Sequence, residues 1–473
     1  MKKIFFTLSA AMLYTIVAAQ SFKISLQSNY KSGIAYLTHY AGSSLNVDDS
    51  AAVNSRGLAV FQGKRLLPPG IYAIVFPGKK LTADFLIGKE QVITIKADTA
   101  NLIKMAVAGS SENLLFQQYQ QFVAKQGKLL NHERQAYNNA RTAPDSALHE
   151  KNYIKYNTAL NNYRNSIIIN KPRSMMAIIL NAMKEPPYPS KVPVTRQDSV
   201  DNYQYYKSHY WDGISFMDDC VVRTPFFAGK LQRYYRDVIT QEPDSIIKDA
   251  DYKLLLARSS PEMYKYLLNW LTDEYLNPKY MGQDAIFVHL FEKYHSKGLT
   301  SWLNEKQMEA ITRRAYMVMA NLVGQKAANL ELADTAGKVA ALYDVAADFT
   351  VVIFWDPNCG HCKDEVPRAD SFYRANWKAK NVKMYAVMTE YDKEGWIKFI
   401  NIHDLKEWTH VHQTLQMVKA DTEAQKPSFK QLYDITQTPT LYLLDKEKRI
   451  VGKKLTLQQL NDLLQVKLSA SAK

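Results

Sequence analysis

Cysteine is scarce in this sequence, and so are long hydrophobic runs. Three cysteines among 473 residues are too few for a small scaffold held together by disulfides. Beyond the N-terminus the sequence has no run of about 18 uncharged apolar residues, which excludes a polytopic membrane protein. It has no internal repeat or low-complexity tract, and 47% apolar with 22% charged residues is typical of globular proteins. At roughly 100–200 residues per domain, the length predicts two to four domains.

The charge balance is basic but points to no particular partner. Lysine and arginine number 60 against 46 aspartates and glutamates, which gives a formal net charge of +14. The basic residues are scattered, and the basic tract from Lys378 to Lys383 has no interleaved aromatic residues. Nucleic-acid binding usually combines a concentrated basic patch with a recognisable motif. We therefore expect solvated basic faces and no nucleic-acid partner.

The N-terminal segment has the pattern of a secretory signal peptide. Lys2 and Lys3 precede an apolar stretch, residues 4–19, and Val17 and Ala19 stand where a signal peptidase needs small residues. The stretch is short for a membrane span, so a short membrane anchor is the less favoured alternative. No cysteine follows directly that would carry a lipid. We expect the mature chain to be soluble in the periplasm or otherwise outside the cytoplasm.

Changes of pattern divide the rest of the chain into three segments. Short alternating runs such as Lys23–Gln27 and Gly70–Phe76, separated by turn signals, predict a small all-β sandwich. Apolar residues then recur at helical spacing and predict a mostly α-helical middle, in which His289 is interpreted as a core histidine. The continuous apolar run Thr350–Trp355 is typical of a strand buried in a parallel sheet, and predicts a C-terminal α/β domain. The predicted boundaries are 1–19 for the signal peptide, 20–108 for the β-sandwich module, 109–323 for the helical module and 324–473 for the α/β domain.

The residues that carry chemistry are Cys359-Gly-His-Cys362. They follow the strand that ends at Trp355 and should open a helix. Two thiols at this spacing can close a disulfide on the first helical turn with little backbone movement. The helix N-terminus favours a thiolate at Cys359, and His361, when protonated, adds a second positive partner. We therefore expect Cys359 to be the exposed attacking sulfur, and Cys362 to be buried and to resolve the mixed disulfide.

Three other interpretations of the cysteine pair are less favoured. A c-type haem site needs a histidine directly after the second cysteine, where this sequence has Lys363. A zinc site needs four ligands, and the sequence has no second cysteine pair. A passive structural disulfide stays open as an alternative. The sequence Thr438-Pro439-Thr440 at the start of a later buried strand favours redox chemistry, because a cis bond there would let a turn face the cysteines.

The segment Phe354–Pro367, together with Thr438–Thr440 and Asp445, resembles the thioredoxin-like thiol-disulfide oxidoreductases of the TlpA and ResA type. The resemblance covers about residues 324–466, under a third of the chain. It implies a thioredoxin-like fold, and dithiol–disulfide exchange outside the cytoplasm without a metal or further cofactor. The two preceding modules are similar to modules of unknown function that are fused to this domain in secreted proteins of Bacteroidota-type bacteria.

The resemblance assigns roles to individual residues. Cys359 matches the nucleophile and Cys362 the resolving thiol. Pro439, preceded by Thr438, matches the cis-proline that lies beside the disulfide and offers backbone groups to a substrate chain. Glu365 lies where ResA-type proteins carry an acidic residue, which can relay a proton to Cys362, and a simple surface charge is an equal alternative. The predicted catalytic residues are Cys359, Cys362, His361 and Glu365, and the predicted substrate-binding residues are Thr438, Pro439, Trp355 and Asn358.

The sequence also departs from the family pattern. Ile353 stands where thioredoxin has a buried aspartate, so either Glu365 or water must move protons, or the proton-transfer step is slow. Asn358 replaces the aromatic residue that usually precedes the first cysteine. Asp356 stands where a thiol peroxidase would carry a threonine, which disfavours peroxidase activity. Cys220 has no partner in this count, and we expect it to be buried and inert rather than a reactive thiol.

We therefore predict an extracytoplasmic thiol-disulfide oxidoreductase that exchanges the Cys359–Cys362 pair with protein substrates. Its partners would be protein thiols or disulfides and a membrane electron donor or acceptor. The alternative is an envelope binding or scaffold protein, in which the N-terminal modules bind a partner and the thioredoxin domain is structural. Faster alkylation of Cys359 than of a free thiol would favour the enzyme.

Overall fold

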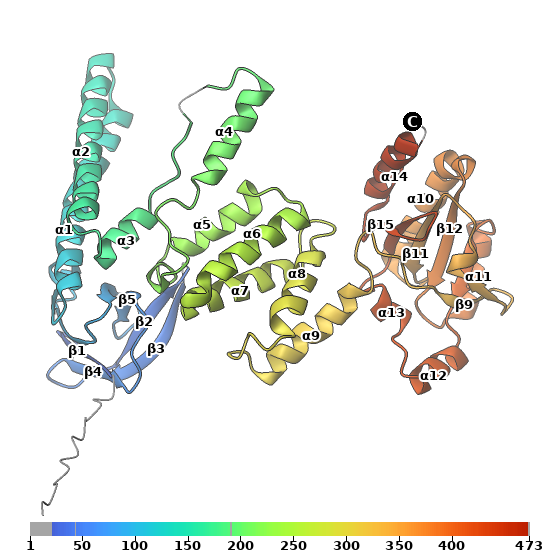
Figure 1. The fold of residues 1–473 in the computed structure, drawn as a ribbon, viewed down its shortest axis with the longest axis horizontal. Coiled ribbons are helices and arrows are strands. Elements are labelled where there is room, and N and C mark those ends of the chain that lie inside the picture. Colours follow the sequence, from blue (N-terminus) through green and yellow to red (C-terminus); the bar gives the residue numbers. More distant parts are fainter. Residues whose placement is uncertain (1–20, 43, 190–191, 472–473) are drawn as a thin grey trace, which may run out of the picture. The chain divides into compact units, whose positions relative to one another are not determined.

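The computed structural model describes residues 21–42, 44–189 and 192–471. The predicted signal peptide, residues 1–19, lies outside the described residues. The described residues divide into two compact units, the first made of those up to Thr240 together with Tyr252–Tyr266, and the second of Gln241–Asp251 together with those from Leu267 onward. Figure 1 labels many of the elements of both units.

The first unit begins with a sandwich of two four-stranded sheets. Its strands are β1 (Phe22–Ser28), β2 (Ile34–Ala41), β3 (Ser44–Ala52), β4 (Leu58–Gly63), β5 (Gly70–Val75), β6 (Thr82–Ile87), β7 (Val92–Ala97) and β8 (Ala106–Ala108). One sheet has the order β4-β1-β7-β8 and the other β3-β2-β5-β6. Because side chains alternate between the two faces of a strand, one residue in two points inward, and Ile24, Leu37, Phe61 and Phe85 meet in one core. The pair β1–β7 is parallel, whereas the other pairs are antiparallel.

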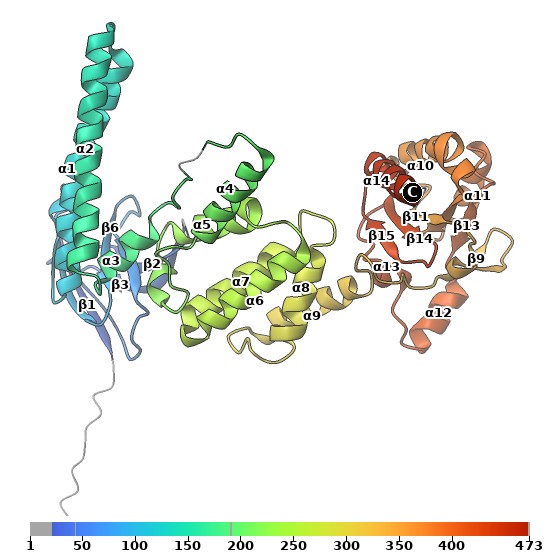
Figure 2. The same cartoon turned by 45° about the horizontal axis from the view of Figure 1, so that its top comes forward.

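A hairpin of two long helices follows the sandwich and is seen side-on in Figure 2. The helices of this part are α1 (Ser111–Asn139), α2 (Ala143–Asn170), α3 (Met175–Ala182), α4 (Arg196–Ser208) and α5 (Phe227–Arg233). Ser110 caps α1 and Thr142 caps α2, each by accepting a backbone N–H in the first turn. The Asn113 side chain bonds to both backbone groups of Leu86, at 2.7 and 2.8 Å, and so fixes α1 to strand β6.

The helices α6 (Pro243–Leu256) and α7 (Pro261–Leu276) contain the boundaries between the two units. Within the second unit they are followed by α8 (Asp284–Leu290), the π-helical turn η5 (Phe291–His295) and α9 (Glu305–Met319). His289 is half-buried, and its Nε2 lies 3.0 Å from a carboxylate oxygen of Asp251. This histidine is therefore paired with an acid at the edge of the apolar region instead of lying wholly in the core.

The second unit ends in a seven-stranded mixed sheet with helices on both faces. Its elements are β9 (Glu331–Asp334), β10 (Val339–Ala341), β11 (Phe349–Trp355), α10 (Gly360–Phe372), β12 (Val382–Met388), α11 (Lys393–Ile402), β13 (Thr409–His412), α12 (Leu415–Glu423), α13 (Phe429–Leu432), β14 (Thr440–Asp445), β15 (Ile450–Lys453) and α14 (Leu457–Ser471). The strand order is β10-β9-β13-β12-β11-β14-β15. Strand β11 pairs in parallel with β12 and antiparallel with β14, so it lies inside the sheet.

Two apolar layers enclose this sheet. Ile353 and Trp355 on β11 face a core to which α10, α11 and α14 contribute, whereas Phe354 faces a second core with α13. Figure 2 shows α10 and α14 on one side of the strands and α13 on the other. All seven residues of β11 are buried, as expected for a strand covered on both faces. The predicted fold class is confirmed: two N-terminal β-sheets, a helical middle and a C-terminal thioredoxin-like α/β domain.

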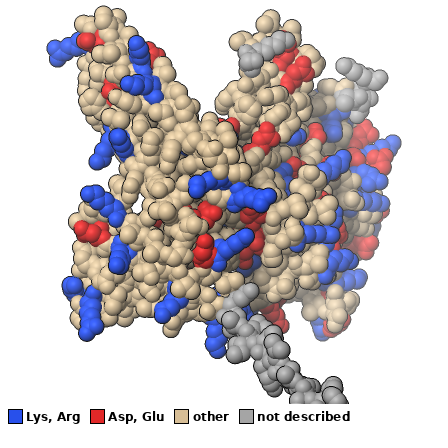
Figure 3. Space-filling view, turned by 60° about the vertical axis from the view of Figure 1, so that its left-hand side comes forward, with Lys and Arg blue, Asp and Glu red and all other residues tan. Residues whose placement is uncertain are grey.

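The surface carries both signs of charge. On the face drawn in Figure 3, lysine and arginine side chains are spread out and interleaved with aspartate and glutamate. Among the described residues, no helix is both long and apolar enough to cross a bilayer.

Candidate active site

The Cys359-Gly-His-Cys362 motif lies where β11 ends and α10 begins. After the buried strand, the chain turns sharply: the Asp356 side chain accepts the N–H of Asn358 at 2.9 Å, and the Asp356 carbonyl accepts the N–H of Cys359 at 3.1 Å. This turn makes Cys359 the N-cap of a 13-residue helix. The strand therefore carries the first thiol to the edge of the sheet, and the helix carries the second back toward the core.

The sulfur of Cys359 takes the place of a capping oxygen. It accepts the backbone N–H of Cys362 at 3.4 Å, one of the amide groups that a helix start leaves without an internal partner. On its other side the same sulfur lies 3.3 Å from the carbonyl oxygen of Thr438. Cys359 is partly exposed, and both cysteines are free thiols in this structure.

The segment from Tyr433 to Pro439 links α13 to β14 and places Thr438 against the first thiol. The Thr438–Pro439 peptide bond is cis, as the resemblance predicted. Thr438 and Pro439 are both partly exposed next to Cys359, so a substrate chain that reaches this sulfur would also meet them. The structure thus brings together four of the eight predicted site residues: Cys359, Cys362, Thr438 and Pro439.

The surroundings of Cys359 lower its pKa. Partial burial raises the pKa and is the largest single influence, but the hydrogen bonds that reach the sulfur outweigh it. These come from the side chains of Thr438 and Cys362 and from the backbone N–H groups of Cys362 and His361. The result is a thiol with more thiolate at neutral pH than a free cysteine has, and the thiolate is the form that attacks a disulfide.

Cys362 has the opposite electrostatic environment. Its side chain is 0% exposed and lies in the core formed by β11, α10, α11 and α14. Burial, the largest cause, raises its pKa to about 12, and the neighbouring Cys359 contributes in the same direction. Two thiols three residues apart therefore differ in both access and acidity, as an attacking and a resolving sulfur must.

The side chains of the remaining four predicted residues have different surroundings. His361 is exposed on the first turn of α10, next to the motif sulfurs in sequence. Glu365 forms an ion pair with Arg368 on the same helix, which favours the surface-charge alternative over a proton relay. Trp355 is fully buried against Phe399, beneath the motif rather than on a surface that a substrate would meet.

Asn358 is exposed, and its side chain donates a hydrogen bond of 3.0 Å to Asp392. Sequence reasoning missed Asp392. It caps α11 by accepting the N–H of Gly395 at 2.9 Å, and the hydrogen bonds from Asn358 and Gly395 lower its pKa. An aspartate just before a helical pattern is a recognisable N-cap signal, but nothing in the sequence indicates its contact with Asn358.

Cys220 lies in the first unit, in a 3₁₀ turn of residues Asp219–Val221, and is 2% exposed. Burial raises its pKa far above that of a free thiol, and the nearby carboxylates of Asp218 and Glu112 act in the same direction. The expected buried, unreactive cysteine agrees with this environment.

Comparison with known protein families agrees with this geometry. Residues 323–453 match the model of the AhpC/TSA family. The C-terminal domain belongs to this family. The predicted resemblance to thioredoxin-like thiol-disulfide oxidoreductases is confirmed for this AhpC/TSA domain, which carries the Cys359–Cys362 pair. Residues 166–321, within the helical middle, match the model of DUF5106, a domain of unknown function.

Several solved structures are similar to parts of the chain. A domain of a possible thiol-disulfide isomerase from Cytophaga hutchinsonii is 38% identical and covers 32% of this chain and 97% of its own, with a TM-score of 0.28. The thioredoxin domain of a thiol-disulfide oxidoreductase from Bacteroides vulgatus is 27% identical over 31% of this chain and 97% of its own, with a TM-score of 0.27. A thioredoxin-like protein from Bacteroides caccae is 20% identical over 60% of this chain and 98% of its own, with a TM-score of 0.46. No curated protein matches the chain.

Proposed function

We propose that this protein is an extracytoplasmic thiol-disulfide oxidoreductase that exchanges its Cys359–Cys362 pair with protein substrates through the AhpC/TSA domain. The observation that carries the proposal is the opposite setting of the two thiols. Cys359 is partly exposed with a lowered pKa, whereas Cys362 is buried with a raised pKa. A structural disulfide would need neither the accessible sulfur nor the difference in acidity.

In the reducing direction the Cys359 thiolate attacks one sulfur of a substrate disulfide. The substrate S–S bond breaks, a mixed disulfide forms, and the first substrate sulfur leaves as a thiolate. Cys362 then gives up its proton and attacks the Cys359 sulfur, which releases the second substrate sulfur and forms the Cys359–Cys362 disulfide. Two electrons pass from the dithiol to the substrate, and the reverse sequence oxidises a substrate dithiol.

The raised pKa of Cys362 fits its place in this sequence. While its pKa stays near 12, the buried thiol is protonated and does not compete for the substrate. Once Cys359 is bound in a mixed disulfide, the charge that it held as a thiolate is gone. One of the influences that raise the pKa of Cys362 then disappears, and resolution becomes easier.

We further propose that the reaction takes place outside the cytoplasm, with a membrane protein as the electron donor or acceptor. The signal-peptide pattern of residues 1–19 supports the location. Outside the cytoplasm, cytosolic thioredoxin and glutathione cannot exchange electrons with the Cys359–Cys362 pair. The pair would therefore need an electron donor or acceptor in the membrane. The helical module and the β-sandwich would then select the substrate or position the site.

Reduction of insulin by the full chain, with dithiothreitol to regenerate the dithiol, tests the proposal. We expect Cys359→Ser to lower the rate to that of dithiothreitol alone, because it removes the attacking thiolate. In a single-turnover reaction from which dithiothreitol has been removed, the reduced Cys362→Ser variant should instead accumulate a mixed disulfide with insulin, because the chain then has no resolving thiol. Cys220→Ser is the matched control and should keep the wild-type rate.

The binding or scaffold alternative predicts a different result. If the thioredoxin-like domain is only structural, the wild-type chain and Cys359→Ser will reduce insulin at the same rate. That outcome would exclude the exchange reaction and leave a binding role for the modules of residues 20–323.

A further inference from the structure

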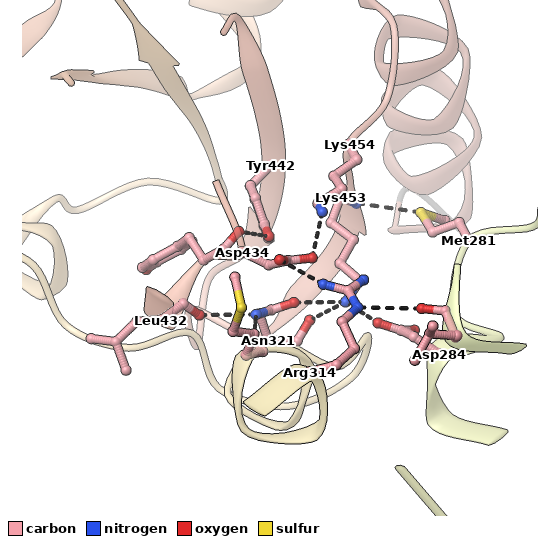
Figure 4. Close-up of polar contacts among 12 residues, drawn as sticks. Met281, Asp284, Arg314, Asn321, Leu432, Asp434, Tyr442, Lys453 and Lys454 are labelled. Carbon is pink, nitrogen blue, oxygen red and sulfur yellow. Dashed lines mark hydrogen bonds and ion pairs between the residues drawn. The ribbon is translucent and has the colours of Figure 1, made fainter. Parts of the chain in front are cut away.

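The segment that carries Thr438 is fixed at its start by a buried carboxylate. Asp434 directly follows α13 and the buried Tyr433, is 2% exposed, and has a positive φ of 48°. Its two oxygens have different partners: Oδ1 lies 2.7 Å from Nη1 of Arg314 and Oδ2 lies 2.5 Å from Nζ of Lys454. Figure 4 shows the carboxylate held between the two cations. Four residues further on, Thr438 contacts the sulfur of Cys359.

Arg314 belongs to α9, which is part of the DUF5106 module, whereas Asp434 belongs to the AhpC/TSA domain. The Arg314 side chain is 21% exposed, and its Nε also donates to the carbonyl of Leu276 at 3.3 Å. The guanidinium is therefore held on both sides. A planar group oriented in this way can fix a carboxylate more firmly than a flexible ammonium can.

A second contact from the DUF5106 module reaches the end of α13, directly before this segment. Just after α9, the Asn321 side chain donates to the carbonyl of Leu432, the last residue of α13, at 3.0 Å. Asn321 is itself fixed, because Lys453 Nζ donates to both its backbone and its side-chain oxygen at 2.8 Å. The buried carboxylate of Asp284 on α8 completes this group by pairing with Lys453. Figure 4 shows these contacts side by side.

The charged residues of this cluster are buried, so the loss of one partner should be costly. Asp284 and Lys453 are 5% and 7% exposed, and charges in such places are strongly penalised if they lose their partner. Burial raises the pKa of Asp434, yet the hydrogen bonds from Lys454 and Arg314 hold it below its usual value. The carboxylate is therefore charged at neutral pH, and removing Arg314 would leave it with one cation instead of two.

We propose that Arg314 is a positioning residue for the thiol site, through which the DUF5106 module holds the Asp434–Thr438 segment against Cys359. The proposal rests on the function proposed above and gives a role in that reaction to a module that has none. Arg314 touches neither thiol. It acts on Asp434, and Asp434 fixes the start of the short segment that ends at the Thr438 contact.

The test compares Arg314→Gln with Arg313→Gln in the full-length protein. Arg313 is the exposed neighbour on the same helix, so its replacement removes the same charge without touching Asp434. For each reduced protein, the rate of alkylation of Cys359 by iodoacetamide is followed against pH by mass spectrometry. Because the Thr438 side chain helps to lower the pKa of Cys359, a displaced segment should raise it. A rise of about half a pKa unit slows alkylation about threefold below the pKa.

We expect Arg314→Gln to shift the alkylation profile to higher pH and Arg313→Gln to leave it unchanged. Arg314→Lys should recover part of the shift, because an ammonium can still pair with Asp434. A fall in urea stability without a shifted profile would show that Arg314 only joins the two domains, and would overturn the proposal. So would equal profiles for all four proteins.

The same proteins separate this proposal from the proposed function. Alkylation needs no protein substrate, so a shifted profile supports the positioning role even if the wild-type chain fails to reduce insulin. Conversely, wild-type insulin reduction with an unshifted Arg314→Gln profile retains the proposed function and rejects the positioning role.

Discussion

The turn around Cys220 and the turn around Cys359 place the same side chain in opposite environments. Cys220 lies in a short 3₁₀ turn and Cys359 caps the 13-residue helix α10, and at both helical starts a backbone N–H needs a capping acceptor. At the first turn the acceptor is a carboxylate: Asp218 takes the N–H of Cys220 at 2.8 Å. At the second turn the acceptor is the cysteine itself, since the Cys359 sulfur takes the N–H of Cys362.

This exchange of roles explains the difference in acidity. When Asp218 caps the turn, its negative charge lies beside the Cys220 thiol, and the buried sulfur packs among apolar side chains such as Ile71 and Leu115. When the sulfur caps the helix, the same kind of N–H group stabilises the thiolate directly. The residue type and a helical start are thus insufficient for reactivity. The reactivity of the cysteine depends on which group accepts the backbone N–H at the start of the helix.

The largest expected effect is a difference in alkylation rate between these two cysteines. In the reduced native protein we expect iodoacetamide to modify Cys359 about a hundredfold faster than Cys220, because the latter is both inaccessible and less acidic. Mass spectrometry of peptides after timed labelling gives both rates. The rate for Cys359 should rise with pH and level off earlier than for a free cysteine, since its lowered pKa means that the thiolate forms at lower pH.

Guanidinium chloride provides the control for that prediction. In the unfolded chain both cysteines should react at nearly the same rate, which would show that the fold creates the difference. Comparable rates in the native protein would mean that Cys220 is reached by solvent, and the contrast drawn from burial would fail.

Substitution of Cys220 is expected to have an intermediate effect, on the free energy of unfolding. Cys220→Ser places a hydroxyl in an apolar core and should lower the free energy of unfolding by about 1–3 kcal/mol if that hydroxyl finds no partner. Cys220→Ala removes the sulfur without adding a polar group, so it should cost less. Urea denaturation of the reduced protein measures both. An alanine variant as unstable as the serine variant would show that lost volume, not polarity, sets the cost.

The sequence predicted the site around Cys359 better than it predicted what surrounds it. The buried strand and the helix start follow from local patterns, because each depends on residues that are neighbours along the chain. The place of Thr438-Pro439 beside Cys359 follows from the family resemblance, since the two segments are 79 residues apart. The three-part fold class also follows from local patterns. Trp355 shows the limit of this reasoning, since proximity to the motif in sequence placed it with the substrate, whereas a residue of an inner strand is buried on either face.

The contacts of Arg314 could not be predicted in this way. Arg314 and Asp434 are 120 residues apart, and neither belongs to a motif. A surface-type arginine on an amphipathic helix is usually solvated, and only the packing of α9 beside α13 brings Arg314 to Asp434. Glu365 is the opposite case. Its position three residues after Cys362 suggested a proton relay, but its carboxylate forms an ion pair with Arg368, one turn further along the helix.

The smallest expected effect concerns the capping role of the Cys359 sulfur. Cys359→Ser keeps an acceptor at the N-cap and replaces sulfur by an oxygen, which helix starts prefer. At neutral pH we expect the free energy of unfolding of the reduced protein to stay unchanged or to rise by about 0.5 kcal/mol, although insulin reduction is lost. Urea denaturation under reducing conditions measures this change.

The pH dependence of this difference in unfolding free energy distinguishes the capping contribution of the Cys359 side chain from the contribution of its thiolate charge. Because the pKa of Cys359 is lower in the folded protein, its thiolate stabilises the fold fully above the pKa of the unfolded thiol, and this contribution is lost as the pH falls through the folded pKa. Serine does not titrate in this range, so any advantage of the serine variant should shrink as the pH rises toward the usual thiol pKa. An advantage that stays constant with pH would mean that the sulfur of Cys359 caps α10 only as a thiol, and that the helix start does not stabilise its charge.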